Sequence, residues 1–316
     1  MKKKQLGSTD LSIYPIVLGG NVFGWTIDEQ TSFQILDKFI AEEFTMIDTA
    51  DSYSRWKPGN SGGESETIIG NWMKRRKNRH SVLIATKAGN DMGSGKKNLS
   101  KKYLLKAADD SLKRLQTDYL DLYQTHWDDD STPVEETLDA YAELIKAGKV
   151  RWIGASNLSP ERLRASLKAS DTFHLPRYQT LQPHYNLAVR KIFEEEYEPI
   201  CKENNLGVLT YYSLAAGFLT GKYRSEADLT KSPRGGGAKK YLNERGLKIL
   251  TALDEVSQQY QTTPAAIALA WLISKPVVSA PVASATSIEQ LASILQSTHI
   301  ELNNDSIALL NNASRE

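Results

Sequence analysis

The chain has 316 residues, enough for one large barrel or two ordinary domains, with a core that needs no disulfide or metal. Its 39 Lys and Arg residues against 38 Asp and Glu residues give a formal net charge of +1, so no overall field favours nucleic acid or an anionic membrane as a partner. Small molecules are therefore the expected partners. The single cysteine, Cys201, excludes an internal disulfide and a cysteine-based zinc site.

The first residues do not have the pattern of an export signal. Three lysines follow Met1, but the next residues are polar where a signal peptide would have its apolar core. No apolar run reaches membrane-spanning length. We therefore expect a soluble cytoplasmic protein.

A hairpin is expected over residues 3–13, turning at the Gly-Ser-Thr-Asp run of residues 7–10. Eight short apolar runs follow, typical of buried strands. The first seven are spaced by about thirty residues, as single strand–helix units are. Their centres lie near Val17, Met46, Ile84, Leu122, Ile153, Leu181, Leu209 and Val278.

Segments with helical spacing of apolar residues lie between these runs and after the last one. Thr31, Ser100 and Ser159 are expected to cap the first, third and fifth of them, the last with a proline at the first helical position. The predicted helices cover residues 33–44, 64–75, 100–115, 134–147, 160–167, 191–204, 244–259, 264–274, 288–296 and 305–313.

Eight strand–helix units favour a closed (β/α)8 TIM barrel, with an N-terminal hairpin and extra C-terminal helices, over an open doubly wound sheet. The glycines of residues 18–24 lack the dinucleotide-fold spacing. Residues 90–97 fail as a phosphate loop, because Asn90 replaces the leading glycine and Lys97 replaces Ser or Thr. No linker or repeat divides the chain, so residues 1–316 are expected to form one domain.

Reactive groups in such barrels lie where the strands end. The second strand ends in Asp48, and Tyr53 follows in the next loop. The third ends in Lys87 and the fourth in His126, each in phase with apolar residues that face inward. Singly, these could be a capping acid, a packed tyrosine, a surface lysine and a core histidine. Agreement between three neighbouring strands favours a site.

These four groups suit the protonation of a carbonyl oxygen. Lys87 is expected to bring the pKa of Tyr53 from about 10 toward neutrality, and Asp48 to hold the ammonium in place. Neutral His126 would orient the carbonyl. Because the set contains no activated nucleophile and no cluster of metal ligands, the electrons are expected to come from a cofactor.

With these residues the chain resembles the aldo-keto reductase superfamily over nearly its whole length, and the family's Asp-Tyr-Lys-His tetrad matches in order. The resemblance implies an NAD(P)(H)-dependent oxidoreductase that interconverts an aldehyde or ketone and the alcohol, with Tyr53 as general acid/base. It also implies nicotinamide contacts from Ser156, Asn157 and Gln179, with the ring of Tyr212 stacked on the nicotinamide. The other implied cofactor contacts are Gly20, Ser213, Leu214, Gly217, Leu219, Gly221, Lys222, Ser284, Thr286 and Gln290.

The segment after the eighth strand bears on the choice of cofactor. Relatives that prefer the 2′-phosphorylated form usually have a Lys or Arg there, whereas residues 283–291 contain none. Ser284, Thr286 and Gln290 can still hydrogen-bond a phosphate, and Ser287 with Gln290 predicts a capping box at a helix N-terminus. We therefore expect the protein to use NADP(H), with only a weak preference over NAD(H), so that NAD(H) could also serve as cofactor.

Two other functions are weighed against this one. Lys87 could act as the nucleophile of a Schiff-base lyase, or the chain could be a non-catalytic, cofactor-binding regulatory subunit of the same fold. Trp25, Trp56 and Trp127 are expected to line an apolar substrate cleft. Residues 224–243, with three consecutive glycines, are expected to form a mobile flap beside the pyrophosphate.

Overall fold

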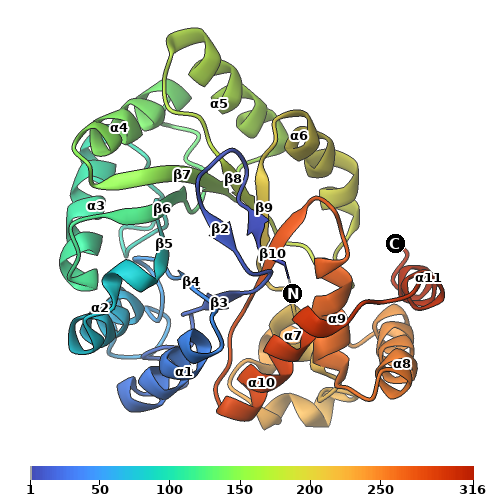
Figure 1. Ribbon diagram of the computed structural model, residues 1–316. Helices are drawn as coiled ribbons and strands as arrows, with labels where there is room; N and C mark the ends of the chain where they lie inside the picture. Colours follow the sequence, from blue (N-terminus) through green and yellow to red (C-terminus); the bar gives the residue numbers. More distant parts are fainter. Residues whose placement is uncertain (1) are drawn as a thin grey trace.

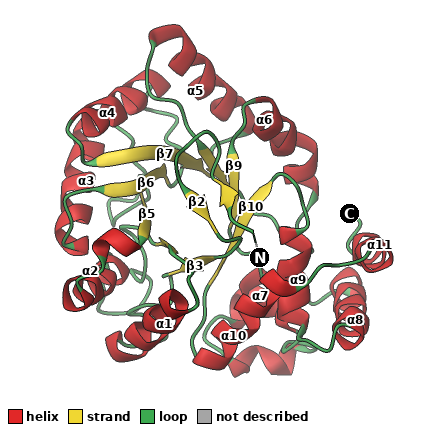
Figure 2. Ribbon diagram, viewed as in Figure 1, coloured by secondary structure: helices red, strands yellow, loops and turns green. Residues whose placement is uncertain are grey.

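The computed structural model describes residues 2–316, and at its centre eight parallel strands form a closed barrel (Figures 1 and 2). Each strand pairs with the next along the chain, and β10 pairs back with β3. The (β/α)8 TIM barrel is therefore confirmed. Its strands are β3 (Val17–Gly19), β4 (Met46–Asp48), β5 (Leu83–Ala88), β6 (Leu120–Thr125), β7 (Val150–Ser156), β8 (Thr180–Gln182), β9 (Gly207–Thr210) and β10 (Val278–Ala283).

The helices surround the barrel as an outer layer, which Figure 2 shows in red around the yellow strands. They are α1 (Glu29–Ala41), α2 (Glu64–Arg76), α3 (Lys101–Leu115), α4 (Val134–Lys146), α5 (Pro160–Phe173), α6 (Glu198–Glu203), α7 (Gly235–Ala238), α8 (Glu244–Gln259), α9 (Pro264–Ile273), α10 (Ile288–Gln296) and α11 (Asn304–Ala313). None of these helices, within residues 2–316, has the length and apolar character that crossing a membrane requires.

Alternation along the strands separates two apolar cores. Inward-facing residues such as Met46, Ala85 and Leu122 form the inner core with Leu6 and Leu11 of the N-terminal hairpin. This hairpin, β1 (Lys4–Gln5) and β2 (Ser12–Ile13), lies across one end of the barrel in Figure 1. It therefore closes the end where the strands begin.

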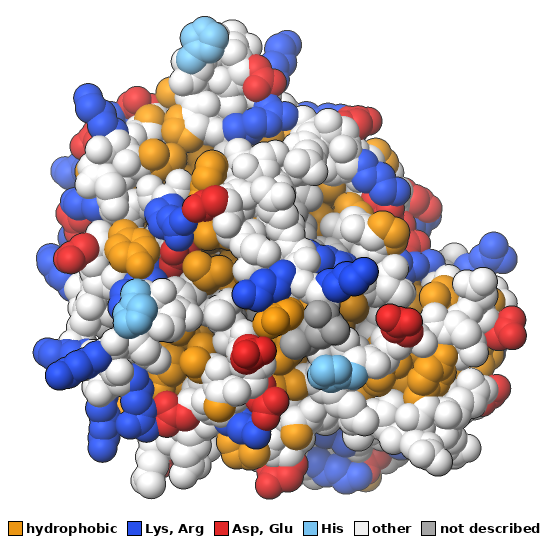
Figure 3. Space-filling view, in the orientation of Figure 1, with side chains coloured by type: hydrophobic (Ala, Val, Ile, Leu, Met, Phe, Trp, Pro, Cys, Tyr) orange, Lys and Arg blue, Asp and Glu red, His pale blue; other side chains and the backbone are white. Residues whose placement is uncertain are grey.

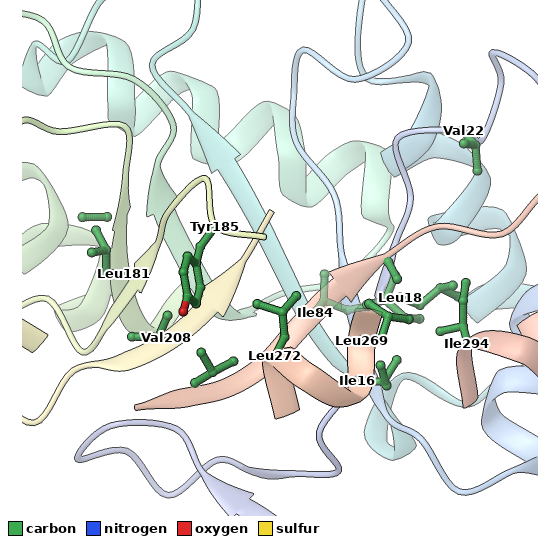
Figure 4. Packing of buried hydrophobic residues seen from close by; sticks show 14 of the residues in the cluster. Ile16, Leu18, Val22, Ile84, Leu181, Tyr185, Val208, Leu269, Leu272 and Ile294 are labelled. Atoms are coloured by element: carbon green, nitrogen blue, oxygen red, sulfur yellow. The ribbon is translucent and has the colours of Figure 1, made fainter. Parts of the chain in front are cut away.

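The outer core lies between the strands and the helices. Outward-facing Leu18, Ile84 and Val208 pack there with helical residues such as Leu269 and Ile294, as Figure 4 shows. On the molecular face in Figure 3, basic and acidic side chains are interspersed, in keeping with the near-zero net charge.

Several helix boundaries differ from the sequence prediction: α1 ends at Ala41 instead of residue 44, and α6 begins at Glu198 instead of residue 191, after a π-helical segment over Phe193–Tyr197. Helix α1 begins four residues early because Asp28, not Thr31, caps it: the Asp28 carboxylate accepts a hydrogen bond from the Thr31 N–H at 2.8 Å. Helix α5 continues to Phe173, where apolar and small residues still face the core, and ends at His174 in a left-handed conformation.

Residues 224–243 also differ from prediction, because they do not form one irregular loop. The segment contains the short helices η4 (Glu226–Lys231), α7 and η5 (Lys239–Tyr241), and both Gly235 and Ala238 are buried. Gly235 lies so close to Leu229 that a Cβ would be 1.9 Å from its carbonyl oxygen. Folding of the segment onto itself therefore explains why glycine suits this position.

Candidate active site

The four predicted reactive residues meet at the barrel end opposite the hairpin. Lys87 Nζ lies at the centre, 2.6 Å from Asp48 Oδ2 and 2.9 Å from the Tyr53 hydroxyl. It also donates to the carbonyl oxygen of Thr49 at 2.7 Å. The ring of His126 lies edge-on to that of Tyr53, with 6.0 Å between their centroids. The structure therefore assembles an ammonium, a phenol, a carboxylate and an imidazole in one place.

Burial governs the charge states of this group. It lowers the pKa of Lys87, an effect that Asp48 opposes, and together with Lys87 it lowers the pKa of His126 well below its usual value. The expectation that Lys87 brings the pKa of Tyr53 toward neutrality is wrong here. Burial raises that pKa well above its usual value, and the Asp48 carboxylate raises it further. Tyr53 is therefore a protonated phenol, and His126 a neutral imidazole, at physiological pH.

Neighbouring amides fix the carboxylate of Asp48. Gln182 Nε2 donates to Asp48 Oδ1 at 2.9 Å, and Gln124 Nε2 approaches the same oxygen at 3.3 Å. Side chains of three strands, β5, β6 and β8, therefore hydrogen-bond to the Asp48 carboxylate, so its orientation does not depend on Lys87 alone.

A second chain of polar groups reaches the imidazole. Ser52 Oγ lies 3.4 Å from His126 Nδ1 and accepts a hydrogen bond from Asn90 Nδ2 at 3.3 Å. When the Ser52 hydroxyl donates to Nδ1, the ring proton resides on Nε2. All three residues line the cavity described next.

A cavity of about 610 Å³ opens above the tetrad, within the size range of ligand sites. Tyr53 and His126 line it together with Trp56 and Trp127, two of the three tryptophans expected there. Trp25 does not line it, but packs edge-on against Trp56 with ring centroids 5.4 Å apart.

Of the four residues predicted to contact the nicotinamide, Gln179 alone does not line the cavity. Ser156 and Asn157 line the cavity at the end of β7, and Asn157 Nδ2 donates to the carbonyl oxygen of His126 at 2.9 Å. Gln179 precedes β8 and lies at the opposite end of the barrel, against Gly7 of the hairpin. Gln182, at the far end of the same short strand, lines the cavity instead.

The loop after β9 forms the next part of the wall. The Tyr212 side chain is 50% exposed, which is unusual for a large aromatic residue, and lines the cavity with Ser213, Leu214, Gly217 and Lys222. Left-handed backbone at Tyr212, Ala216 and Gly217 makes this a tight loop of the type that binds anions. Leu219 and Gly221 do not line the cavity.

Beyond this loop, Ser284 and Gln290 line the cavity as expected, whereas Thr286 does not. Ser287 caps α10 by accepting from the Gln290 N–H at 3.3 Å. The predicted capping box is only half formed, because the Gln290 side chain accepts from the Thr286 N–H and hydroxyl.

Two cavity residues at the start of the barrel differ from the prediction, which names Gly20 alone. Gly19, not Gly20, lines the cavity, and a Cβ there would lie 2.6 Å from Ser284 Oγ. Asn21 was missed: it lines the cavity and accepts a hydrogen bond from the Ser284 hydroxyl.

Two cations line the cavity near Tyr212, and only Lys222 was expected. Arg234, from the segment predicted to be a flap, is the second. Burial lowers the pKa of Arg234. Neither cation forms an ion pair with a carboxylate in residues 2–316, so both are available to an anion. No sequence signal marked Arg234, because it lies in a polar stretch without periodicity.

Clusters of three or more His, Cys, Asp or Glu residues that could hold a metal ion are absent from residues 2–316. The cavity instead offers amides, a half-exposed aromatic ring and two cations without a carboxylate partner among the described residues. These groups suit an elongated organic ligand with negative charge.

Known proteins resemble this chain along most of its length. Residues 15–315 match the Aldo/keto reductase family. Protein tas of Escherichia coli (strain K12) is 32% identical, over 98% of this chain and 96% of its own length. Aldo-keto reductase YhdN of Bacillus subtilis (strain 168) is 33% identical, over 91% and 84%. The NADH-specific methylglyoxal reductase of Escherichia coli (strain K12) is 29% identical, over 98% and 97%.

Proposed function

The chain belongs to the aldo/keto reductase family, and on that premise we propose that it interconverts an aldehyde or ketone and the corresponding alcohol with NAD(P)(H). Oxidoreductase activity follows from the family. The direction, the substrate and the roles of individual residues are the proposal. We also propose that residues 1–316 form one domain, since β10 near the end of the chain completes the barrel beside β3 near its start.

The contact between Lys87 and the Tyr53 hydroxyl, at 2.9 Å under the cavity, carries this proposal. A nicotinamide cofactor supplies a hydride in one direction and accepts one in the other. In reduction, the protonated Tyr53 phenol donates its proton to the carbonyl oxygen. The phenolate left behind faces the Lys87 ammonium, which stabilises it, and Asp48 keeps that ammonium in position.

His126 has a different role. As a neutral imidazole with its proton on Nε2, it donates a hydrogen bond to the same carbonyl oxygen and sets the direction of approach. Ser52 and Asn90 keep the ring in this tautomer. Trp56 and Trp127 line the cavity with Tyr53 and His126 and would limit the access of water to the reacting atoms.

The cavity wall fits a nicotinamide dinucleotide. Ser156, Asn157 and Gln182 would contact the amide, and the open face of Tyr212 would stack on the ring. Lys222 and Arg234 would hold phosphate groups, while Ser284 and Gln290 would contact the adenosine part. These two cations replace the one missing from residues 283–291 and support NADP(H) as the favoured form.

Steady-state assays on a panel of aldehydes, ketones and sugars test the proposal, run in both directions with both cofactors. Turnover of at least one carbonyl compound is expected, with a higher kcat/KM for NADP(H) than for NAD(H). A chain that binds cofactor but turns over nothing on the panel would instead be a binding subunit. Borohydride trapping of a Lys87 adduct would indicate a Schiff-base enzyme.

A further inference from the structure

A second cluster of buried polar groups lies directly behind Lys87, away from the cavity. Asp51 belongs to the loop that joins Asp48 to Tyr53, and only 3% of it is exposed. Its N–H donates to the carbonyl oxygen of Lys87 at 3.0 Å, which fixes the loop to β5. None of the proposed steps uses its carboxyl group.

The other two buried acids of this region have partners. Glu66 of α2 accepts from the Thr86 hydroxyl at 2.5 Å and from Arg114 Nε at 2.6 Å. Asp48 is paired with Lys87. Asp51 forms no ion pair with any residue from 2 to 316, and its Oδ1 has no hydrogen-bond donor there.

The charges of this region therefore do not balance if every group is ionised. Three carboxyl groups, Asp48, Asp51 and Glu66, share two cations, Lys87 and Arg114, and both cations are already paired. Leaving a buried carboxylate unpaired costs far more than leaving it protonated. Asp51, as the acid left over, is the group that keeps its proton.

The surrounding groups agree with this assignment. Burial is the main cause that raises the pKa of Asp51 to about 8, and the Glu66 charge adds to it, whereas the Arg114 charge, a hydrogen bond from the Ser52 N–H and the Lys87 charge lower it. The buried Tyr123 hydroxyl also lacks a partner among the described residues, and the Asp51 charge is one reason its pKa is raised. The titratable groups around Asp51, from its own loop, α2, β5, α3 and β6, are Asp48, Glu66, Lys87, Tyr103, Arg114 and Tyr123.

We propose that Asp51 is a positioning residue that is neutral at physiological pH and ionises in alkaline solution, where its charge holds Lys87 as an ammonium. It acts through Lys87, so the inference rests on the proposed role of the Lys87–Tyr53 pair. Burial favours loss of the Lys87 proton, and a negative Asp51 opposes that loss. The reaction consequently extends to higher pH than the buried lysine alone would allow.

Asp51→Asn tests this, because an amide mimics the neutral carboxyl group but cannot ionise. At about pH 6 the variant should have nearly wild-type kcat. The alkaline limb of its pH profile should begin about one unit lower, which makes kcat about tenfold lower than wild type near pH 9.5. The matched control is Asp118→Asn, which removes an exposed carboxylate and should leave the profile unchanged.

An activity-independent measurement accompanies the profile. Infrared spectra of the wild-type protein labelled with 13C in the aspartate carboxyl should show a protonated-carboxyl band that titrates between about pH 7 and 9. This band should be missing from Asp51→Asn. The infrared band reports whether Asp51 carries a proton even if no substrate is found. Failure of the proposed reaction can therefore be distinguished from failure of this inference.

Three outcomes would overturn the proposal. An Asp51→Asn profile that is parallel to wild type at every pH, whether equal or uniformly lower, would reduce Asp51 to a packing role. If the wild-type spectrum lacked any protonated-aspartate band, Asp51 would be ionised throughout, and a band that did not titrate would show that it never ionises; either result would overturn the proposal even if the variant failed to fold.

Discussion

Each end of the barrel buries an aspartate that forms an ion pair with at least one cation, and the two aspartates differ in what surrounds them. Asp121, at the hairpin end, is bound by Arg79 at 2.8 Å and Arg151 at 2.6 Å, and accepts the Ile84 N–H at 2.9 Å. Asp48, at the opposite end, is bound by Lys87 at 2.6 Å. Each carboxylate side chain is only 1% exposed.

The two ends differ in what else the cation bound to the aspartate contacts. Arg151 also pairs with Asp10 of the hairpin, so the network at that end closes on itself. Lys87 instead contacts the Tyr53 hydroxyl, which faces a cavity. A buried ion pair therefore indicates a reactive site only when one partner contacts a group that opens to a ligand.

Breaking the closed network should have the largest effect, and on stability alone. Asp121→Asn should lower the free energy of unfolding by about 3–5 kcal/mol, because it leaves Arg79 and Arg151 without their shared carboxylate. Urea unfolding measures this, and kcat of the folded protein should stay near wild type. In the control Asp109→Asn, whose pair with Lys149 is half exposed, the loss should be about 0–1 kcal/mol. An Asp121→Asn variant with unchanged stability but a low kcat would contradict the prediction, because Asp121 would then serve catalysis and not stability.

Removing the Tyr53 hydroxyl should give the opposite pattern. Tyr53→Phe should lower kcat by about 10²-fold or more and leave cofactor affinity and unfolding nearly unchanged. Tyr197→Phe is the control, because its hydroxyl donates to the Leu158 carbonyl oxygen outside the cavity. Near wild-type turnover in Tyr53→Phe, with chemistry rate-limiting, would contradict the role of Tyr53.

The open end should also depend on its unpaired cations. Arg234→Gln should weaken cofactor binding by about 1.5–3 kcal/mol, the usual loss for a charge-assisted hydrogen bond. Arg224→Gln, in the same segment but paired with Asp254 at 2.7 Å, should bind as wild type does. Titration with both cofactors adds detail. A loss confined to NADP(H) would assign Arg234 to the 2′-phosphate, and an equal loss for both would assign it to the pyrophosphate. No loss with either would remove it from the site.

Acid should destabilise the open end through His184, which packs against Tyr211 and Tyr212. Burial lowers the pKa of His184 to about 4, below the value of about 6.5 in the unfolded chain. The unfolded state therefore takes up the proton first, and this stability is present above about pH 6.5 and is lost toward pH 4.

His184→Gln should remove about 1–2 kcal/mol of that pH dependence, measured as urea unfolding at about pH 7 and pH 4.5. His174→Gln, on the surface at the end of α5, should leave the pH dependence as it is. An unchanged dependence in His184→Gln would mean that other groups cause the acid sensitivity.

The smallest expected effect concerns residues 224–243, which contribute Arg234 to the cavity from short helices. Saturating cofactor should slow proteolysis of this segment a few-fold by ordering its backbone. The hairpin end should show no such protection. Identical cleavage with and without cofactor would argue against a closing flap.

Sequence periodicity was sufficient for the barrel and for the tetrad. Period-two alternation placed Asp48 and Lys87 on inward faces, and strand order brought their ends together, so one-dimensional spacing determined a three-dimensional cluster. The family resemblance assigned Gln179 to the nicotinamide, but Gln179 precedes β8 at the hairpin end, whereas Gln182 at the other end of β8 lines the cavity. Similar residue types around a strand do not say at which end of the barrel each residue lies.

Two features of the site depend on contacts between residues that are distant in the sequence. Arg234 reaches the cavity from a stretch without periodicity, because that segment folds into short helices against the loop of residues 215–220. The protonated state of Asp51 follows from counting the charges of α2, α3 and β5 around it. Sequence spacing encodes the direction of a side chain along its own strand or helix, whereas burial, charge balance and access to a ligand depend on every element packed around it.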